Sequence, residues 1–197
     1  MNIFFLHLNP KTNARLYINK HCVKIILECT QMLYTALWKN NDTSDWISQH
    51  EQYLGSNPYK ATHYNHPMAK WVRLSLDNYN YTIDIALALC YEYTTRFGKV
   101  HKCQPRLEWL QKHPPVSFPK QHIDHHCATL NIPRQCTPIP LAMPKQFYSN
   151  DVLYSYRLYY LVEKSALITP KDTFNLRQRI EEWNLYDDVP LSILIKQ

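Results

Sequence analysis

Residues 20–38, KHCVKIILECTQMLYTALW, carry the pattern that decides the fold. On a helical wheel, at about 100° per residue, apolar side chains cover the whole surface except for one sector about 80° wide. That sector holds His21, Lys24, Glu28, Gln31 and Thr35, which are spaced three and four residues apart. A helix that is apolar nearly all round is a central, buried one. We therefore expect a core helix that carries one narrow polar strip.

Two interpretations of the polar strip are open. Lys24 and Glu28 could form an i,i+4 ion pair on a thin solvent-facing seam, which would contribute only about 0.2–0.5 kcal/mol. Alternatively, the strip forms the floor of a cleft, where a carboxylate, an amine and an imidazole serve as acid, base or nucleophile. A solvent-facing surface usually has interchangeable charges over a wide arc. The narrow and chemically mixed strip therefore favours the cleft.

Helical periodicity and end signals predict three main helices and a C-terminal helix. They cover about residues 13–38, 67–97, 151–167 and 172–185. Pro67 suits the first turn of the second helix and Gly98 suits its end, because proline is tolerated at a helix start and glycine at a left-handed C-cap. Ser149 or Asn150 is expected to cap the third helix. Residues 3–8 are expected to form a short strand or an extended arm.

Prolines and glycines mark the connections. The chain has only two glycines, which argues against many tight hairpins or a Gly-rich phosphate loop. Eight of its thirteen prolines lie between positions 105 and 144, so residues 103–146 are predicted to be a long irregular loop region. Residues 170–197 then form a C-terminal appendage. The expected fold class is all-α, with residues 1–197 in a single compact domain that has long Pro-rich loops.

Composition indicates a globular protein with an acidic partner. Hydrophobic residues make up 45% of the 197 residues, which is enough for a core. The net charge of +6 favours an acidic partner, either nucleic acid or an anionic membrane surface, and the partner that we expect is DNA, most simply double-stranded, or a nucleotide. No run reaches the roughly 18 apolar residues of a membrane span, so no membrane association is expected. Six cysteines without a C-x-x-C pair predict reduced thiols in an intracellular protein. We expect a monomer.

One tract contains residue types that bind metals. It runs from His122 to Cys127 and includes Asp124, His125 and His126. Adjacent histidines on a loop rarely give both side chains to one ion, and no second cluster has matching spacing. We therefore predict neither a metal site nor a cofactor.

Basic and polar residues around the second helix are candidates for binding the substrate or nucleic acid. Lys60, His63 and His66 precede this helix, whose free N–H groups would favour an anion. An ordinary polar loop is the alternative interpretation of these three residues. Ser75 and Asn78 on the same helix are further candidates.

Two more groups lie at helix ends. Arg96, Lys99 and His101, at the end of the second helix, would hold a nucleic-acid backbone or merely offset the helix dipole. The third helix carries tyrosines and a lysine that form either a base-stacking platform or part of the core: Tyr156, Tyr159, Tyr160 and Lys164.

Three segments together resemble a known family. They are Lys20-His21 followed by Glu28; His66-Pro67 followed by Tyr79, Glu92 and Arg96-Phe97-Gly98; and Tyr156-Arg157-Leu158-Tyr159-Tyr160 with Lys164. The family is the phage pyrimidine-dimer DNA glycosylases of the endonuclease V type. The chain is also similar to small uncharacterised proteins of phages and large DNA viruses. The resemblance touches roughly two-thirds of the chain.

The resemblance implies a specific chemistry at the first helix. Glu28 matches the catalytic carboxylate of the family, whose members form an imine between an α-amino group and deoxyribose. In the family this amine belongs to a small residue exposed by removal of the initiator methionine, whereas here Asn2 follows Met1. The family's arginines near the carboxylate are replaced by Leu27 and Gln31. Met1 by resemblance, and Lys24 by its position one turn from Glu28, are the candidate amines.

The resulting hypothesis is a glycosylase-like enzyme, with or without lyase activity, that acts on a damaged or modified pyrimidine in DNA. Glu28 would position water or stabilise positive charge on the sugar, supported by His21 and Gln31. Basic residues would contact phosphates, and Tyr159 or Tyr160 would stack on a base. The alternatives are an enzyme of free nucleotide or modified-base metabolism, and a non-enzymatic module that binds nucleic acid or protein.

Overall fold

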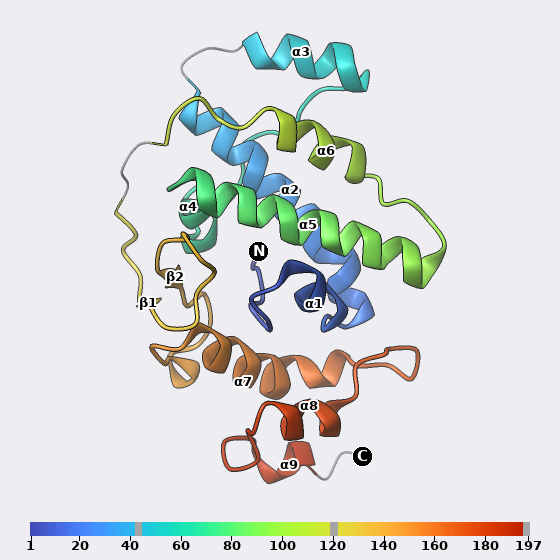
Figure 1. The fold of residues 1–197 in the computed structure, drawn as a ribbon, viewed down its shortest axis with the longest axis vertical. Helices are drawn as coiled ribbons and strands as arrows, with labels where there is room; N and C mark the ends of the chain where they lie inside the picture. Colours follow the sequence, from blue (N-terminus) through green and yellow to red (C-terminus); the bar gives the residue numbers. More distant parts are fainter. Residues whose placement is uncertain (42–44, 119–121, 195–197) are drawn as a thin grey trace.

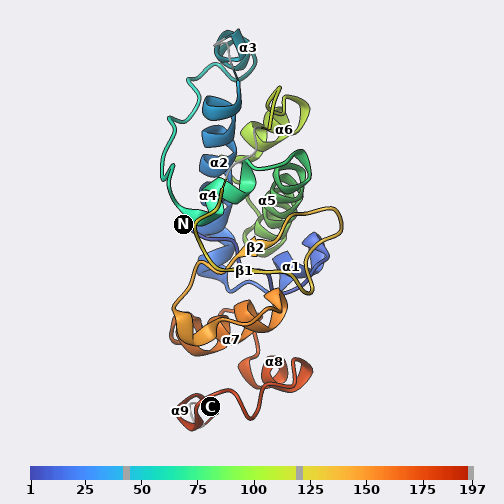
Figure 2. The same cartoon turned by 90° about the vertical axis from the view of Figure 1, so that its left-hand side faces the viewer.

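Helix α2 (Asn19–Asn40) is the central element, as residues 20–38 predict. In the computed structural model, which describes residues 1–41, 45–118 and 122–194, α2 packs against α5 (Leu76–Phe97). Figures 1 and 2 show these two long helices side by side. Most apolar side chains of α2 are buried, including Cys22, Ile25 and Met32, whereas Val23 and Leu27 are exposed.

The chain breaks before α2, so the single helix predicted over residues 13–38 is wrong. A separate short helix, α1 (Pro10–Arg15), ends at Leu16. The N–H of Ile18 donates to the Tyr160 hydroxyl (3.0 Å), and Arg96 donates to the carbonyl of Tyr17 (2.7 Å). Tertiary hydrogen bonds therefore take the place of helical ones at this junction, and no local pattern in the sequence signals them.

The second predicted helix is also two helices, α4 (Pro67–Val72) and α5. Its predicted start and end are confirmed, because His66 caps α4 and Gly98 ends α5 at φ +64°. The break comes from Ser75, whose hydroxyl accepts from the N–H of Asn78 and starts α5. The buried Asn78 side chain then donates to the carbonyl of Trp71 (2.8 Å), which satisfies the end of α4.

Residues 103–146 contain more regular structure than predicted. Helix α6 (Gln104–Lys112) begins with a proline in its first turn, where proline is compatible with a helix. Strands β1 (Cys127–Ala128) and β2 (Ile139–Pro140) pair antiparallel, and the 3-10 turn η1 (Lys145–Phe147) follows. Helix α3 (Asp45–Leu54) was not predicted.

The third predicted helix corresponds to α7 (Val152–Lys164) and the 3-10 turn η2 (Ser165–Leu167). Its cap is Asp151 rather than Ser149 or Asn150, since the Asp151 carboxylate accepts from the N–H groups of Leu153 and Tyr154. The C-terminal part contains two short helices, α8 (Leu176–Glu182) and α9 (Leu191–Leu194), instead of one helix over 172–185.

The N-terminal segment is an arm in the core. Ile3 to Leu6 are buried, and they belong to no helix or strand. Side chains hold their backbone instead. The Tyr17 hydroxyl accepts from the N–H of Phe4 (2.8 Å), and the Asn13 side chain accepts from the N–H of Leu6 (2.8 Å). Figure 1 shows the N-terminus near the middle of the molecule, between α2 and α7.

The protein is mostly helical, with 56% of its residues in helices. The part of the chain that the structure describes forms one compact body of nine helices and a two-stranded hairpin, rather than three main helices. Helices α3 and α6 lie at one end of the long axis, and α8 and α9 lie at the other (Figure 1). Over the described residues, no helix is both long and apolar enough to cross a bilayer.

Candidate functional site

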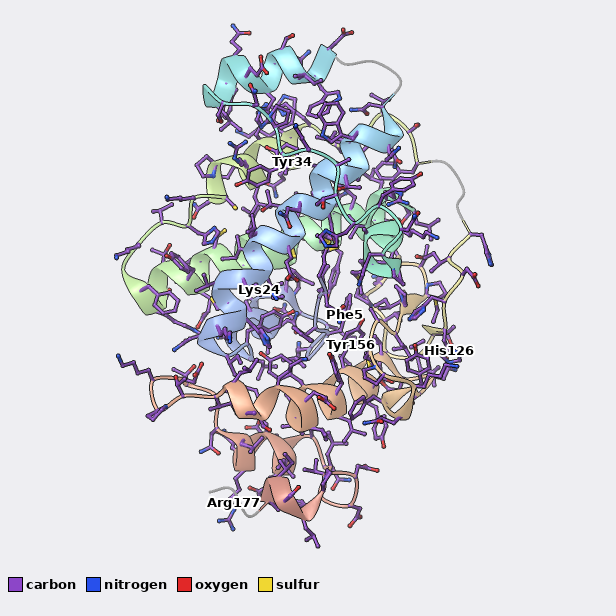
Figure 3. All side chains as sticks on the ribbon, turned by 180° about the vertical axis from the view of Figure 1, so that it is seen from behind. Phe5, Lys24, Tyr34, His126, Tyr156 and Arg177 are labelled. Atoms are coloured by element: carbon purple, nitrogen blue, oxygen red, sulfur yellow. The ribbon has the colours of Figure 1, made fainter. Side chains whose placement is uncertain are left out.

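A pocket of about 270 Å³ lies over the first half of the polar strip of α2. Four parts of the chain form it: the N-terminal arm, α2, the stretch after β2 and α7. Its lining consists of Met1, Asn2, Phe4, His21, Lys24, Ile25, Glu28, Ala142, Tyr159 and Lys164. Figure 3 shows Lys24 on α2, on the side of the molecule that faces the viewer, with α7 below it.

Glu28 is the acid of this pocket, and its carboxylate has three nitrogen partners. The main-chain N–H of Asn2 donates to Oε2 at 2.8 Å. On the other oxygen, Oε1, the α-amino group of Met1 lies at 3.8 Å and the Nζ of Lys24 at 3.3 Å. Glu28 is only 8% exposed. One largely buried carboxylate therefore holds two amines at the same oxygen.

The two amines belong to residues with different surroundings. The side chain of Lys24 is 62% exposed, whereas Met1 is partly buried and its thioether side chain is 2% exposed. A third amine, that of Lys164, lies over the ring of Tyr159 at 4.6 Å from its centroid. This cation–π contact holds the ammonium at the edge of the pocket and occupies one face of the tyrosine ring.

His21 is buried beside these amines and is electrically neutral. The Tyr160 hydroxyl accepts from the N–H of Ile18 (3.0 Å), and its oxygen lies 2.8 Å from His21 Nδ1. We assign the ring proton of His21 to Nε2, because this tautomer gives the proton of the buried Tyr160 hydroxyl an acceptor at Nδ1. Burial lowers the pKa of His21 to about 4, and the ammonium groups of nearby lysines act in the same direction. His21 therefore offers the pocket an N–H donor and no charge.

The structure places six residues predicted for the site around the pocket: Met1, His21, Lys24, Glu28, Tyr159 and Lys164. Gln31 lies one turn further along α2 and does not line it. Beyond Gln31 the strip is covered, because the Thr35 hydroxyl accepts from the N–H of Thr62 (3.1 Å). Asn2, Phe4 and Ala142 were missed, since no local pattern connects them to α2.

Two of the tyrosines predicted to stack on a base are in the core instead. Tyr156 and Tyr160 are 0% and 1% exposed. The Tyr156 hydroxyl donates to the carbonyl of Pro140 (2.9 Å), and Tyr160 bridges Ile18 and His21. These two tyrosines, four residues apart on α7, therefore pack in the core, and neither ring is accessible to a base.

Arg96 does not have a free guanidinium for phosphate. Its side chain is 7% exposed and paired with Glu92, and it donates to the carbonyls of Arg15 and Tyr17. It therefore stabilises the α1–α2 junction. Lys99 is exposed and His101 accepts from the N–H of Cys103, but neither lines the pocket.

The polar loop before α4 differs from the predicted anion site. Helix α4 has six residues, and the imidazole of His66 itself accepts from the N–H of Met68. Lys60 and His63 are exposed. Burial lowers the pKa of His66, and so does the positive charge of the N-terminal amine. His66 is thus in electrostatic range of the pocket, although it helps to form a helix cap.

Ser75 and Asn78 are structural as well, because they form the break between α4 and α5. Within the described ranges, no three His, Cys, Asp or Glu side chains are grouped closely enough to hold a metal ion. In the tract from His122 to Cys127, His125 bonds to the carbonyl of Leu141 (2.7 Å) and His126 stacks on Tyr148.

No protein-family model, curated protein or solved structure matches this chain.

Proposed function

We propose that this protein is a DNA glycosylase with lyase activity that acts on a damaged or modified pyrimidine nucleotide. The observation that carries the proposal is the pairing of amines with a buried carboxylate, in which Met1 and Lys24 approach the same oxygen of Glu28. An amine next to a carboxylate in a pocket is what imine chemistry on a sugar requires.

The reaction can be written with this set of groups. The unprotonated amine attacks C1′ of the nucleotide, the bond between C1′ and the base breaks, and its electron pair leaves with the base. Nitrogen then loses two protons, one to the departing base and one through Glu28 to O4′ as the C1′–O4′ bond opens, which gives a neutral imine and a hydroxyl at C4′. Glu28 would stabilise positive charge at C1′ and accept the proton from nitrogen.

Met1 is the amine that we favour. A lysine becomes nucleophilic at neutral pH when burial removes its hydration. The side chain of Lys24 is 62% exposed, so water solvates it. An α-amino group is in general a weaker base than a lysine amine, and a larger fraction of it is unprotonated at neutral pH. Lys24 would then act as a cation beside Glu28.

The neutral N–H of His21 and the ammonium of Lys164 complete the proposal. A nucleotide that enters the pocket has a leaving base and phosphate oxygens, all of which accept hydrogen bonds. His21 would donate to a sugar or base oxygen without adding charge. Lys164 would lie near a phosphate, where a cation offsets negative charge.

Borohydride trapping tests this function. The protein is incubated with duplex oligonucleotides that contain a thymine dimer or an abasic site, and borohydride reduces any imine to a stable covalent adduct. Glu28→Gln should lower the yield of adduct at least about 100-fold, in the range for loss of an essential acid or base. Glu51→Gln, an exposed residue on α3, is the matched control and should leave the yield unchanged.

The trapped adduct also identifies the amine. Amino-terminal analysis and peptide mapping of the reduced protein should place the sugar on Met1. A modified Lys24 would keep the imine but reassign its nucleophile. Full adduct formation by Glu28→Gln, or no adduct on either DNA, would contradict the proposed function. In the second case, turnover of free nucleotides by the same protein would support the alternative enzyme class.

A further inference from the structure

The outer face of α2 combines two lysines with two aliphatic side chains. Lys20 and Lys24 are exposed, Val23 is 41% exposed and Leu27 is 39% exposed. Val23 and Leu27 are four residues apart, so they are neighbours on the helix surface. They belong neither to the buried core nor to the partly buried hydrophobic residues that pack against it. This helix thus presents an apolar pair to the outside, where polar residues are usual.

This apolar pair lies at the edge of the pocket. Leu27 directly precedes Glu28, so their side chains point about 100° apart around the helix. Lys24 projects between them and lines the pocket. Going around α2 from the pocket toward the outside, the side chains therefore follow one another in the order Glu28, Lys24, Leu27 and Val23. Figure 3 shows that Lys24, in the middle of this series, is on an uncovered side of α2.

Duplex DNA has the properties that this surface matches. Taking a nucleotide out of the stack leaves a gap and costs a few kcal/mol, and proteins often fill such a gap with an apolar side chain. Phosphates on either side of the gap need cations, and Lys20 and Lys24 lie along the same face, with Lys164 across the pocket. A free nucleotide has no base stack, so it would leave Val23 and Leu27 without a partner.

We propose that Leu27, supported by Val23, inserts into the base stack of double-stranded DNA next to the nucleotide that enters the Glu28 pocket. This inference rests on the proposed function and adds to it the side chain that fills the gap in the base stack of a duplex. Leu27 is then a residue that determines specificity for duplex DNA. It takes no part in the bond-making steps.

The test compares one abasic site in two settings. Single-turnover rates of adduct formation are measured on an oligonucleotide as a duplex and as a single strand, which has no opposing stack to fill. Leu27→Ala should slow the reaction on the duplex about tenfold or more, equivalent to about 1.4 kcal/mol or more. On the single strand its rate should stay within about twofold of the original. Leu27→Met, which keeps an apolar side chain of similar length, should restore the duplex rate.

A matched control and a second measurement make the test specific. Leu191→Ala removes a leucine that is 74% exposed on α9, at the opposite end of the molecule from α3, and should change neither rate. A fluorescent 2-aminopurine next to the abasic site should become brighter when the original protein unstacks it, and less bright with Leu27→Ala.

The outcomes separate this inference from the proposed function. If Leu27→Ala slows adduct formation equally on the duplex and the single strand, or slows it on neither, the insertion of Leu27 is overturned. The imine chemistry of the proposed function would still hold in both cases. If the original protein forms no adduct on either DNA, the proposed function fails and the inference fails with it. Selective loss on the duplex, with rescue by Leu27→Met, would support both.

Discussion

At the scale of single residues, Glu28 shows how an acid is held in a nearly buried place. It is the only acidic residue of α2; the Asn2 N–H donates a hydrogen bond to it, and the amines of Met1 and Lys24 offset its charge as ion-pair partners. A buried carboxylate without such partners would be costly. The same contacts bring the amine of Met1 to the carboxylate, so the arrangement that stabilises the folded arm also assembles the candidate site.

Two histidines predict how stability depends on pH. Burial lowers the pKa of both His21 and His50 to about 4, assisted by lysines around His21 and by Arg106 at His50. Below the ordinary histidine pKa of about 6.5, the unfolded chain binds protons that the folded protein does not. Their stabilising contribution is therefore complete above pH 6.5 and is lost as the pH falls toward 4. Each histidine contributes about 1.4 kcal/mol per pH unit in this window.

Urea unfolding followed by tryptophan fluorescence at pH 7, 6 and 5 measures this dependence. His50→Gln keeps an acceptor for Tyr34 and Arg106 and should reduce the slope of unfolding free energy against pH by up to about 1.4 kcal/mol per pH unit. His126→Gln, at an exposed position, is the control. An unchanged slope in His50→Gln would contradict burial of a neutral His50 side chain.

Six of the ten residues that line the candidate site were predicted from the sequence. His21, Lys24 and Glu28 could be grouped because they share one face of one helix. Asn2 and Ala142 could not be added to this group. Asn2 bonds to Glu28, which is 26 residues away in the sequence, and to the carbonyl of Ala142, which is 140 residues away. The hydrogen bond of His21 was equally out of reach, because its partner Tyr160 is 139 residues away.

At the scale of elements, residues that mark a helix start or end predicted those ends correctly, but the breaks inside the predicted helices were not predicted. Pro67 and Gly98 mark a start and an end that depend only on their own backbone. The break at Ser75 depends on Asn78, which bonds to Trp71 and to the backbone N–H of Thr137 (3.0 Å). Helical periodicity continues through this break, so the sequence pattern alone suggests a single helix.

Ser75→Ala tests the cap that separates the two helices. The serine hydroxyl accepts from the N–H of Asn78 at the start of α5. Its loss should lower the free energy of unfolding by about 1 kcal/mol, the usual cost of removing such a cap. Ser48→Ala, at an exposed position within α3, should change it by less than about 0.5 kcal/mol. Equal values for the two variants in urea unfolding would show that the cap contributes nothing.

At the scale of the whole molecule, charge is arranged around the pocket. The chain carries a net charge of +6, and all the cationic residues of α2 are lysines: Lys20, Lys24 and Lys39. The ammonium groups of Lys20, Lys24 and Lys164 all act on His21, so they surround one small region. If these three contact phosphates, each releases counterions when DNA binds, and salt weakens the complex.

Salt dependence therefore distinguishes a duplex from a free nucleotide. Three phosphate contacts predict a slope of about −2.7 for log K against log salt concentration, because each contributes about −0.9. Lys20→Ala should reduce the slope to about −1.8 and weaken binding to all sequences alike. Lys112→Ala, on the exposed side of α6 toward the α3 end of the molecule (Figure 1), should leave it unchanged. Fluorescence anisotropy with a labelled duplex between about 50 and 200 mM salt measures both slopes.

Because Lys20 lies outside the pocket, a slope that does not respond to Lys20→Ala would show that DNA does not bind along α2. That result would favour a small ligand confined to the Glu28 pocket.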